Sequence, residues 1–158
     1  MQGDPRIIDL LNQVLRKELT GINQYFVHSR MCKSWGYAVL AKASYEEAID
    51  EMKHADKILE RILFLDGGPN LSDYDRLLVG STVREQIDND LALEMAALTV
   101  LRPGITLCLE AGDHGSRELL EHIVQDEEHH VDWLEAQKHK IEEVGYQAYL
   151  AQQIYESQ

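Results

Sequence analysis

The chain is 158 residues long, 44% of them hydrophobic and 27% charged, and its formal net charge is −13 at pH 7. This length fits one domain with a buried core, and the composition is not that of a disordered chain. The negative charge argues against binding to nucleic acid or to anionic membrane surfaces.

The sequence also carries no signal for export or membrane insertion. Its first residues, MQGDPRII, lack the basic flank and apolar stretch of a signal peptide, and we find no apolar run of about 18 residues. The two cysteines, Cys32 and Cys108, form neither a CxxC nor a CxxCH motif, so no thiolate metal site or covalent haem is expected. We therefore expect a cytoplasmic protein with reduced thiols.

The first half of the chain predicts two long helices. Asp4 and Pro5 are typical of a helix start, with an N-cap residue before a proline at the first helical position. Helical spacing of apolar residues continues to Gly36, and a second helical pattern stops at the sequence DGGP. The segment 66–81 has no helical period and is long for a connection in a compact domain.

The second half predicts two more long helices and a short one. Thr82 and Glu85 form a capping box that opens the third helix, and Pro103 should kink or break it after about Leu101. The fourth helix closes at Gly145, before a short amphipathic piece. The expected helices span 5–35, 39–65, 82–111, 114–144 and 146–156. Short, long and short connections predict an all-α four-helix bundle in one domain, 1–158, with a long crossover and a short fifth helix.

The two predicted hairpins carry the same pattern of acidic residues and histidines. Glu51 and Glu127 lie in the apolar stripes of the second and fourth helices, and each precedes a histidine by three residues. Asp126 and His129 have the same spacing but fall on the flank of the stripe. The stripes of the first and third helices contain Glu18 and Glu94, and each lies 33 residues before the glutamate of its partner helix.

Four buried glutamates need compensation, because burying even one isolated carboxylate costs several kcal/mol. Two divalent cations would balance four carboxylates. We therefore predict a dinuclear site in which each cation has one terminal glutamate and one histidine, with Glu51 and Glu127 shared. Carboxylate and imidazole ligands without thiolate suit iron or manganese better than structural zinc, and this ligand set is typical of ferritin-like di-iron bundles.

The chain resembles a bacterioferritin along its whole length. The resemblance rests on the GD start and on LLNQVLRKELTGINQYFVHSRM, IDEMKHADKILERILFLDGGPNL, DLALE and DEEHHVDWLE. It implies a ferritin-like bundle in a cage of twenty-four subunits, which oxidises Fe(II) with dioxygen or peroxide and stores ferric mineral. Matched by position, one iron would be held by Glu18, Glu51 and His54, and the other by Glu94, Glu127 and His130.

The resemblance implies further roles outside this ligand set. Tyr25 would sit beside the di-iron centre, and Met52 would ligate haem b at a twofold interface between subunits. A small iron–sulfur ferredoxin would deliver electrons through this haem to release iron. Glu46, where other members have a histidine, would form an inner-wall iron site with Asp50.

Several questions stay open from the sequence. These are co-assembly with a paralogous subunit, haem occupancy, the preferred oxidant, the route by which iron enters, and whether the di-iron pair is a stable cofactor or in transit. The alternative function is a soluble di-iron oxidase acting on an organic substrate, for which the short chain leaves little room. A bundle without metal would carry apolar residues at positions 18, 51, 94 and 127.

Overall fold

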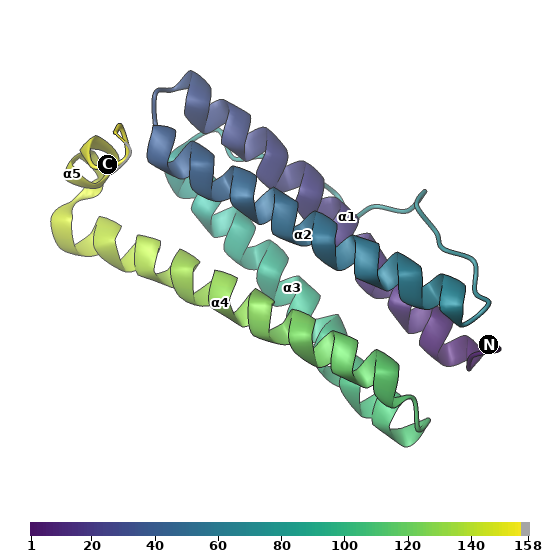
Figure 1. The fold of residues 1–158 in the computed structure, drawn as a ribbon. Coiled ribbons are helices and arrows are strands. Elements are labelled where there is room, and N and C mark those ends of the chain that lie inside the picture. The colour runs from purple at the N-terminus through teal and green to yellow at the C-terminus, as the bar shows by residue number, and fades with distance from the viewer. Residues whose placement is uncertain (156–158) are drawn as a thin grey trace.

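Within residues 1–155, which the computed structural model describes, the chain forms five α-helices and no β-strand. The helices are α1 (Pro5–Ser34), α2 (Ala38–Phe64), α3 (Val83–Glu110), α4 (His114–Val144) and α5 (Tyr146–Ala151). The four long helices form the bundle, and α5 lies at the end where α4 closes (Figure 1). The predicted all-α fold class, with its short C-terminal helix, is confirmed.

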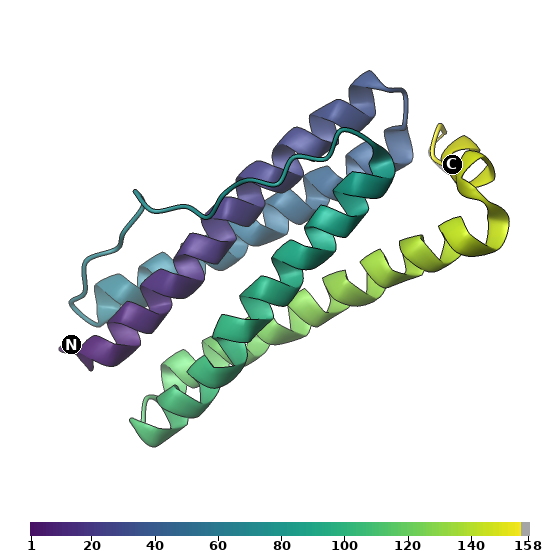
Figure 2. The ribbon, with the colours of Figure 1, turned by 180° about the vertical axis from the view of Figure 1, so that it is seen from behind.

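The long connection between α2 and α3 runs along the bundle beside α1 (Figure 2). Asp75 attaches it to α1, because its carboxylate pairs with Arg16 at 2.8 Å and with Lys17 at 2.7 Å. The crossover therefore joins two antiparallel hairpins, α1–α2 and α3–α4, as the connection lengths predicted.

The helix starts follow the predicted capping residues. The Asp4 side chain accepts a hydrogen bond from the backbone N–H of Arg6 at 2.9 Å, and Pro5 is the first helical residue. Thr82 caps α3 by accepting a hydrogen bond from the N–H of Glu85 at 3.1 Å. These side chains satisfy backbone donors that have no partner inside the helix.

Two details of the helix ends differ from the alternatives considered. α3 continues through Pro103 to Glu110, close to the expected span 82–111, so the break after about Leu101 does not occur. Tertiary packing holds the helix together here, because Gly104 lies so close to α1 that a Cβ would be 2.7 Å from Leu10 Cδ1. α5 ends at Ala151, before the expected residue 156, which lies outside the described residues.

By length and composition alone, α3 could also cross a membrane. It contains an 18-residue window of mean hydropathy 1.4, although the sequence showed no uninterrupted apolar run. Core helices of soluble proteins pass the same test, and 33% of this window is buried inside the bundle. α3 also carries Glu94, which is fully buried. We therefore read α3 as a bundle helix.

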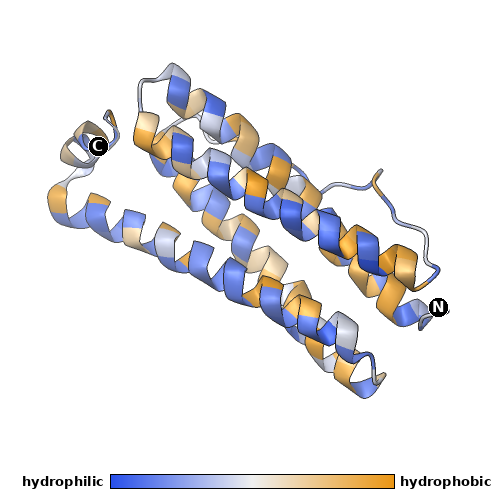
Figure 3. Ribbon diagram, in the orientation of Figure 1, coloured by the Kyte–Doolittle hydropathy of each residue, from blue (hydrophilic) through white to orange (hydrophobic). Residues whose placement is uncertain are grey.

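The buried side chains form two separate hydrophobic clusters. Hydrophilic and hydrophobic positions alternate around the long helices (Figure 3). The larger cluster includes Ile7, Leu11, Leu15, Ile58, Ile62, Leu98, Leu101, Leu120 and Ile123. The smaller includes Cys32, Leu40, Val83, Ile87, Leu134, Ile141 and Tyr149. Along all four long helices, the segments between these clusters carry buried polar side chains.

A buried histidine ties the end of the crossover to this polar region. The N–H of Gly80 donates to His28 Nε2 at 3.0 Å, so the ring proton is on Nδ1, which lies 2.9 Å from Asp90 Oδ1. Gln24 also donates to Asp90, at 2.9 Å. The crossover, α1 and α3 thus share one hydrogen-bond network.

The close packing at Gly80 leads to a prediction about stability. A Cβ at this position would lie against the backbone nitrogen of Gln86 and 2.8 Å from its Cα, and backbone cannot move aside easily. Gly80→Ala should therefore lower the free energy of unfolding of the metal-free protein by about 1–3 kcal/mol in urea denaturation. Gly68→Ala is the matched control, because a Cβ there meets nothing within 4 Å. Equal midpoints for the two variants would contradict this packing.

Candidate metal centre

The six predicted iron ligands lie together in the middle of the bundle, between the two hydrophobic clusters. They come from all four long helices. Each side chain is buried, with at most 8% of the residue exposed. The six residues are Glu18 on α1, Glu51 and His54 on α2, Glu94 on α3, and Glu127 and His130 on α4.

Four of these residues converge on one point, which we call the first cluster. Ligand atoms of Glu18, Glu51, His54 and Glu127 all lie within 4.8 Å of one another. His54 Nδ1 is 3.1 Å from Glu127 Oε1 and 3.3 Å from Glu18 Oε2. When two atoms bind the same ion at about 2.1 Å each, they are separated by up to about 4 Å. The distances in the first cluster therefore suit a single cation.

The second cluster adjoins the first through Glu51. It contains Glu47, Glu51, Glu94 and His130, whose ligand atoms also lie within 4.8 Å of one another. His130 Nδ1 is 3.4 Å from Glu94 Oε1 and 3.7 Å from Glu51 Oε1. The same Glu51 oxygen is 3.9 Å from His54 Nδ1, so this carboxylate lies between the two histidines as expected of a shared ligand. Glu127, the other expected shared ligand, groups with the first cluster only.

Each of the four buried glutamates keeps at least one carboxylate oxygen without a hydrogen-bond partner among the described residues. Within residues 1–155, buried side-chain atoms without a hydrogen-bond partner include oxygens of Glu18, Glu51, Glu94 and Glu127 and Nδ1 of His130. Burial, followed by the negative charges of neighbouring glutamates, raises the pKa of Glu18 and raises that of Glu51 well above its ordinary value. The metal-free site therefore favours protons on carboxylates that a cation would displace.

The surrounding carboxylates raise the pKa values of the two histidines. Burial alone lowers the pKa of His54, but its close contacts with the Glu127 and Glu18 carboxylates outweigh burial and raise the pKa to about 11. The pKa of His130 is also raised, against the effect of burial, by its hydrogen bond to Glu47. Each ring thus acts as a cation that partly balances the carboxylates in the absence of metal.

Tyr25 lies beside the second cluster. Its hydroxyl donates to Glu94 Oε1 at 2.5 Å, and only 2% of the residue is exposed. Burial and the charge of Asp90 raise the pKa of this phenol well above its ordinary value. Tyr25 therefore stays protonated and holds the Glu94 carboxylate in place.

Two carboxylates that the sequence interpretation did not assign to the centre contact the outer nitrogens of its histidines. Asp126 Oδ2 on α4 is 2.8 Å from His54 Nε2 on α2. Glu47 on α2 contacts His130 Nε2 on α4. In both pairs Nδ1 is left facing the cluster, and such outer partners fix the tautomer and orientation of ligand histidines.

A sequence signal for these two residues existed but was weak. Glu47 is four residues before Glu51 and so shares its helix face. Asp126 falls on the flank of the α4 stripe, which is where it can reach across to α2.

The remaining predicted residues lie outside the two clusters. Met52 is half-exposed on α2. Glu46 is exposed and belongs to neither cluster, whereas Asp50 Oδ2 lies 3.8 Å from His130 Nε2. Glu47, and not the adjacent Glu46, lies near Asp50 and His130.

The fold and the site together define a class of protein: a ferritin-like four-helix bundle with a candidate dinuclear carboxylate–histidine centre. The sequence profile of the ferritin family, described as a ferritin-like domain, matches residues 8–144.

The chain also matches curated bacterioferritins over nearly its full length. It is 49% identical to those of Mycobacterium bovis and Mycobacterium leprae over 152 residues, which cover 96% of this chain and 96% of each relative. It is 48% identical to that of Rhodobacter capsulatus over 149 residues, which cover 94% of this chain and 92% of the relative. The chain belongs to the bacterioferritin family.

The buried charge at Glu51 leads to a second prediction. The pKa of the Glu51 carboxyl is higher in the folded protein than its ordinary value of 4.5. Once the pH rises above 4.5, the folded state therefore binds more protons than the unfolded state. The stability of the metal-free protein should then fall with rising pH, and Glu51→Gln should weaken this fall. At pH 7 the substitution should raise the free energy of unfolding by about 1 kcal/mol or more.

Chemical denaturation from pH 5 to 8 measures this effect. Glu60→Gln is the control on the same helix, because the Glu60 side chain is 70% exposed and pairs only with Lys57 among the described residues. A loss of stability in Glu51→Gln at pH 7 would contradict the interpretation.

Proposed function

We propose that this protein stores iron: it oxidises Fe(II) to Fe(III) at the two linked clusters and deposits ferric iron inside a cage of twenty-four subunits. The observation that carries the proposal is the set of four buried glutamates, each with an oxygen that lacks a hydrogen-bond partner within residues 1–155, arranged around two points that share Glu51. Two divalent cations would neutralise this charge. Membership of the bacterioferritin family supports the same function.

In this proposal each cluster holds one ferrous ion. Glu18 and His54 bind the first ion and Glu94 and His130 the second, with Glu51 between them and Glu127 beside the first. Two adjacent ferrous ions can give two electrons to one oxidant, so that peroxide and two protons become two waters without release of a one-electron radical. Glu47 becomes an added candidate ligand of the second ion.

The surrounding side chains would prepare the ligands for the metal. Asp126 and Glu47 accept from the outer nitrogens of the two histidines and keep Nδ1 free for iron. Tyr25 holds Glu94 by its hydroxyl. Because Glu18 and Glu51 have raised pKa values, iron binding should release protons.

Met52 supports a second group in this proposal, haem b between two subunits. Its thioether is 50% exposed on α2, so it is free to ligate a group outside the bundle. One methionine from each of two copies would hold the haem iron, and neutral thioethers favour its ferrous form, which suits one-electron transfer. A small iron–sulfur ferredoxin would supply the electrons that release stored iron. We place the protein in the cytoplasm, where Cys32 and Cys108, both free and buried, stay reduced.

The alternative, oxidation of an organic substrate, has less support. The cavity beside Tyr25 and His130 holds only about 10 Å³, whereas sites for organic ligands measure about 300–1,000 Å³. The larger pockets at His54 and His130, of about 740 and 380 Å³, are lined mostly by charged side chains and lack the predominantly hydrophobic lining of sites for organic ligands.

The ferroxidase proposal predicts the behaviour of a ligand variant. Glu127→Gln should slow the first rapid phase of aerobic Fe(II) oxidation by at least about tenfold in stopped-flow absorbance, because it removes one charged ligand from the first cluster. Glu128→Gln is the control at the next residue, since its side chain is 55% exposed and lies 3.7 Å from Arg102. A rapid phase that Glu127→Gln leaves unchanged would contradict the assignment.

The haem proposal is tested separately from iron oxidation. Met52→Leu should abolish binding of added haem, measured by its absorption spectrum, and should leave the rapid oxidation phase unchanged, because Met52 lies outside both clusters. Met95→Leu, on α3 and 44% exposed, is the matched control and should bind haem normally. Haem binding by the Met52 variant at the level of the unaltered protein would overturn the role of Met52.

A further inference from the structure

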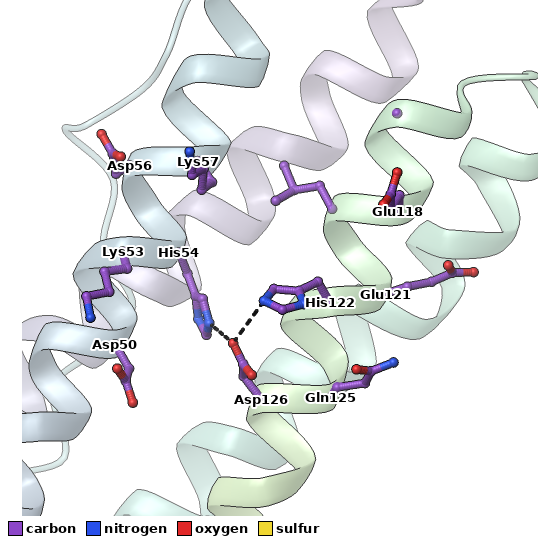
Figure 4. A pocket seen from close by; sticks show the side chains of 12 residues that line it. Asp50, Lys53, His54, Asp56, Lys57, Glu118, Glu121, His122, Gln125 and Asp126 are labelled. Atoms are coloured by element: carbon purple, nitrogen blue, oxygen red, sulfur yellow. Dashed lines mark hydrogen bonds and ion pairs between the residues drawn. The ribbon is translucent and has the colours of Figure 1, made fainter.

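A pocket of about 740 Å³ opens between α2 and α4, next to the first cluster. Its lining includes the acidic and imidazole side chains of Asp50, His54, His122 and Asp126, together with Lys53 and Lys57. Figure 4 shows His54 reaching from α2 toward Asp126, with His122 on the other side of the same carboxylate. The pocket thus connects solvent with the outer nitrogen of a ligand histidine.

One carboxylate oxygen in this pocket lies between two imidazoles. Asp126 Oδ2 is 2.8 Å from His54 Nε2 and 3.8 Å from His122 Nε2. His122 and Asp126 are four residues apart, so they share one face of α4, and Glu118 lies a further four residues back on that face. A separation of 3.8 Å suits an imidazole nitrogen and a carboxylate oxygen that bind the same cation at about 2 Å each.

Exposure falls step by step from the mouth of the pocket to the centre. The side chain of His122 is 72% exposed, that of Asp126 is 39% exposed and that of His54 only 7%. The other nitrogen of His54 faces the first cluster, 3.1 Å from Glu127. His54 is therefore a buried group whose two nitrogens face the pocket and the cluster.

We propose that His122 and Asp126 bind a third divalent cation, with water completing its coordination. This inference rests on the proposed function, because the site would hold iron that exchanges between the pocket and the first cluster. Asp126 can serve both neighbours, since one oxygen accepts from His54 while the carboxylate binds the cation. The carboxylate and imidazole donors suit ferrous iron and its common substitute Co(II).

Anaerobic titration with Co(II), followed by its visible absorption and by calorimetry, tests the site without iron oxidation. The unaltered protein should bind three equivalents per chain, two in the clusters and one at His122. His122→Gln should lose one equivalent and keep the other two. His129→Gln is the matched control on the same helix, because His129 lies outside this pocket and forms no ion pair among the described residues, and it should keep all three.

The possible outcomes separate this inference from the proposed function. Two equivalents in the unaltered protein, or three in His122→Gln, would overturn the third site and leave the di-iron centre standing. Fewer than two equivalents in the unaltered protein would overturn the di-iron centre itself. Loss of one equivalent in His129→Gln as well would show that the effect is not specific to His122, and would also overturn the site.

Discussion

Four carboxylates buried between two apolar clusters set the main constraint on this structure. Each of them keeps at least one oxygen without a hydrogen-bond partner in the described part of the chain, so the bundle holds a concentration of negative charge in a place where burial disfavours it. His54 and His130 offset part of it, and raised pKa values at Glu18 and Glu51 offset more. Divalent cations would neutralise the buried carboxylates more completely than protons do, because one cation binds several carboxylates at once.

The two halves of the centre are related but not equivalent. Each hairpin supplies a lone glutamate and a glutamate–histidine pair, and this repeat makes the site nearly symmetric. The symmetry ends at the outer partners, where Glu47 lies four residues before Glu51 but Ile123 occupies the matching place before Glu127. His130 is consequently held by Glu47 and His54 by Asp126, and only the Asp126 side leads to the larger pocket. If both clusters bind metal as proposed, the two positions should differ in how readily they exchange it.

Much of the fold and the convergence of the six central side chains could be predicted from the sequence, because periodicity and spacing along a helix determine which residues share a face. The spacing of 33 residues between Glu18 and Glu51, and between Glu94 and Glu127, places all four side chains at one level of the bundle. Contacts between side chains of different helices cannot be predicted from the spacing along one helix. The roles of Glu47 and Asp126 depend on the gap between α2 and α4, and the continuity of α3 through Pro103 depends on how Gly104 packs against Leu10.

Anomalous diffraction at the iron edge, from crystals soaked anaerobically with Fe(II), would test the central claim most directly. We predict two peaks inside each bundle, one among Glu18, Glu51, His54 and Glu127 and one among Glu51, Glu94 and His130. A bundle interior without anomalous density at saturating iron would show that protons alone neutralise the four glutamates, and would contradict the di-iron centre.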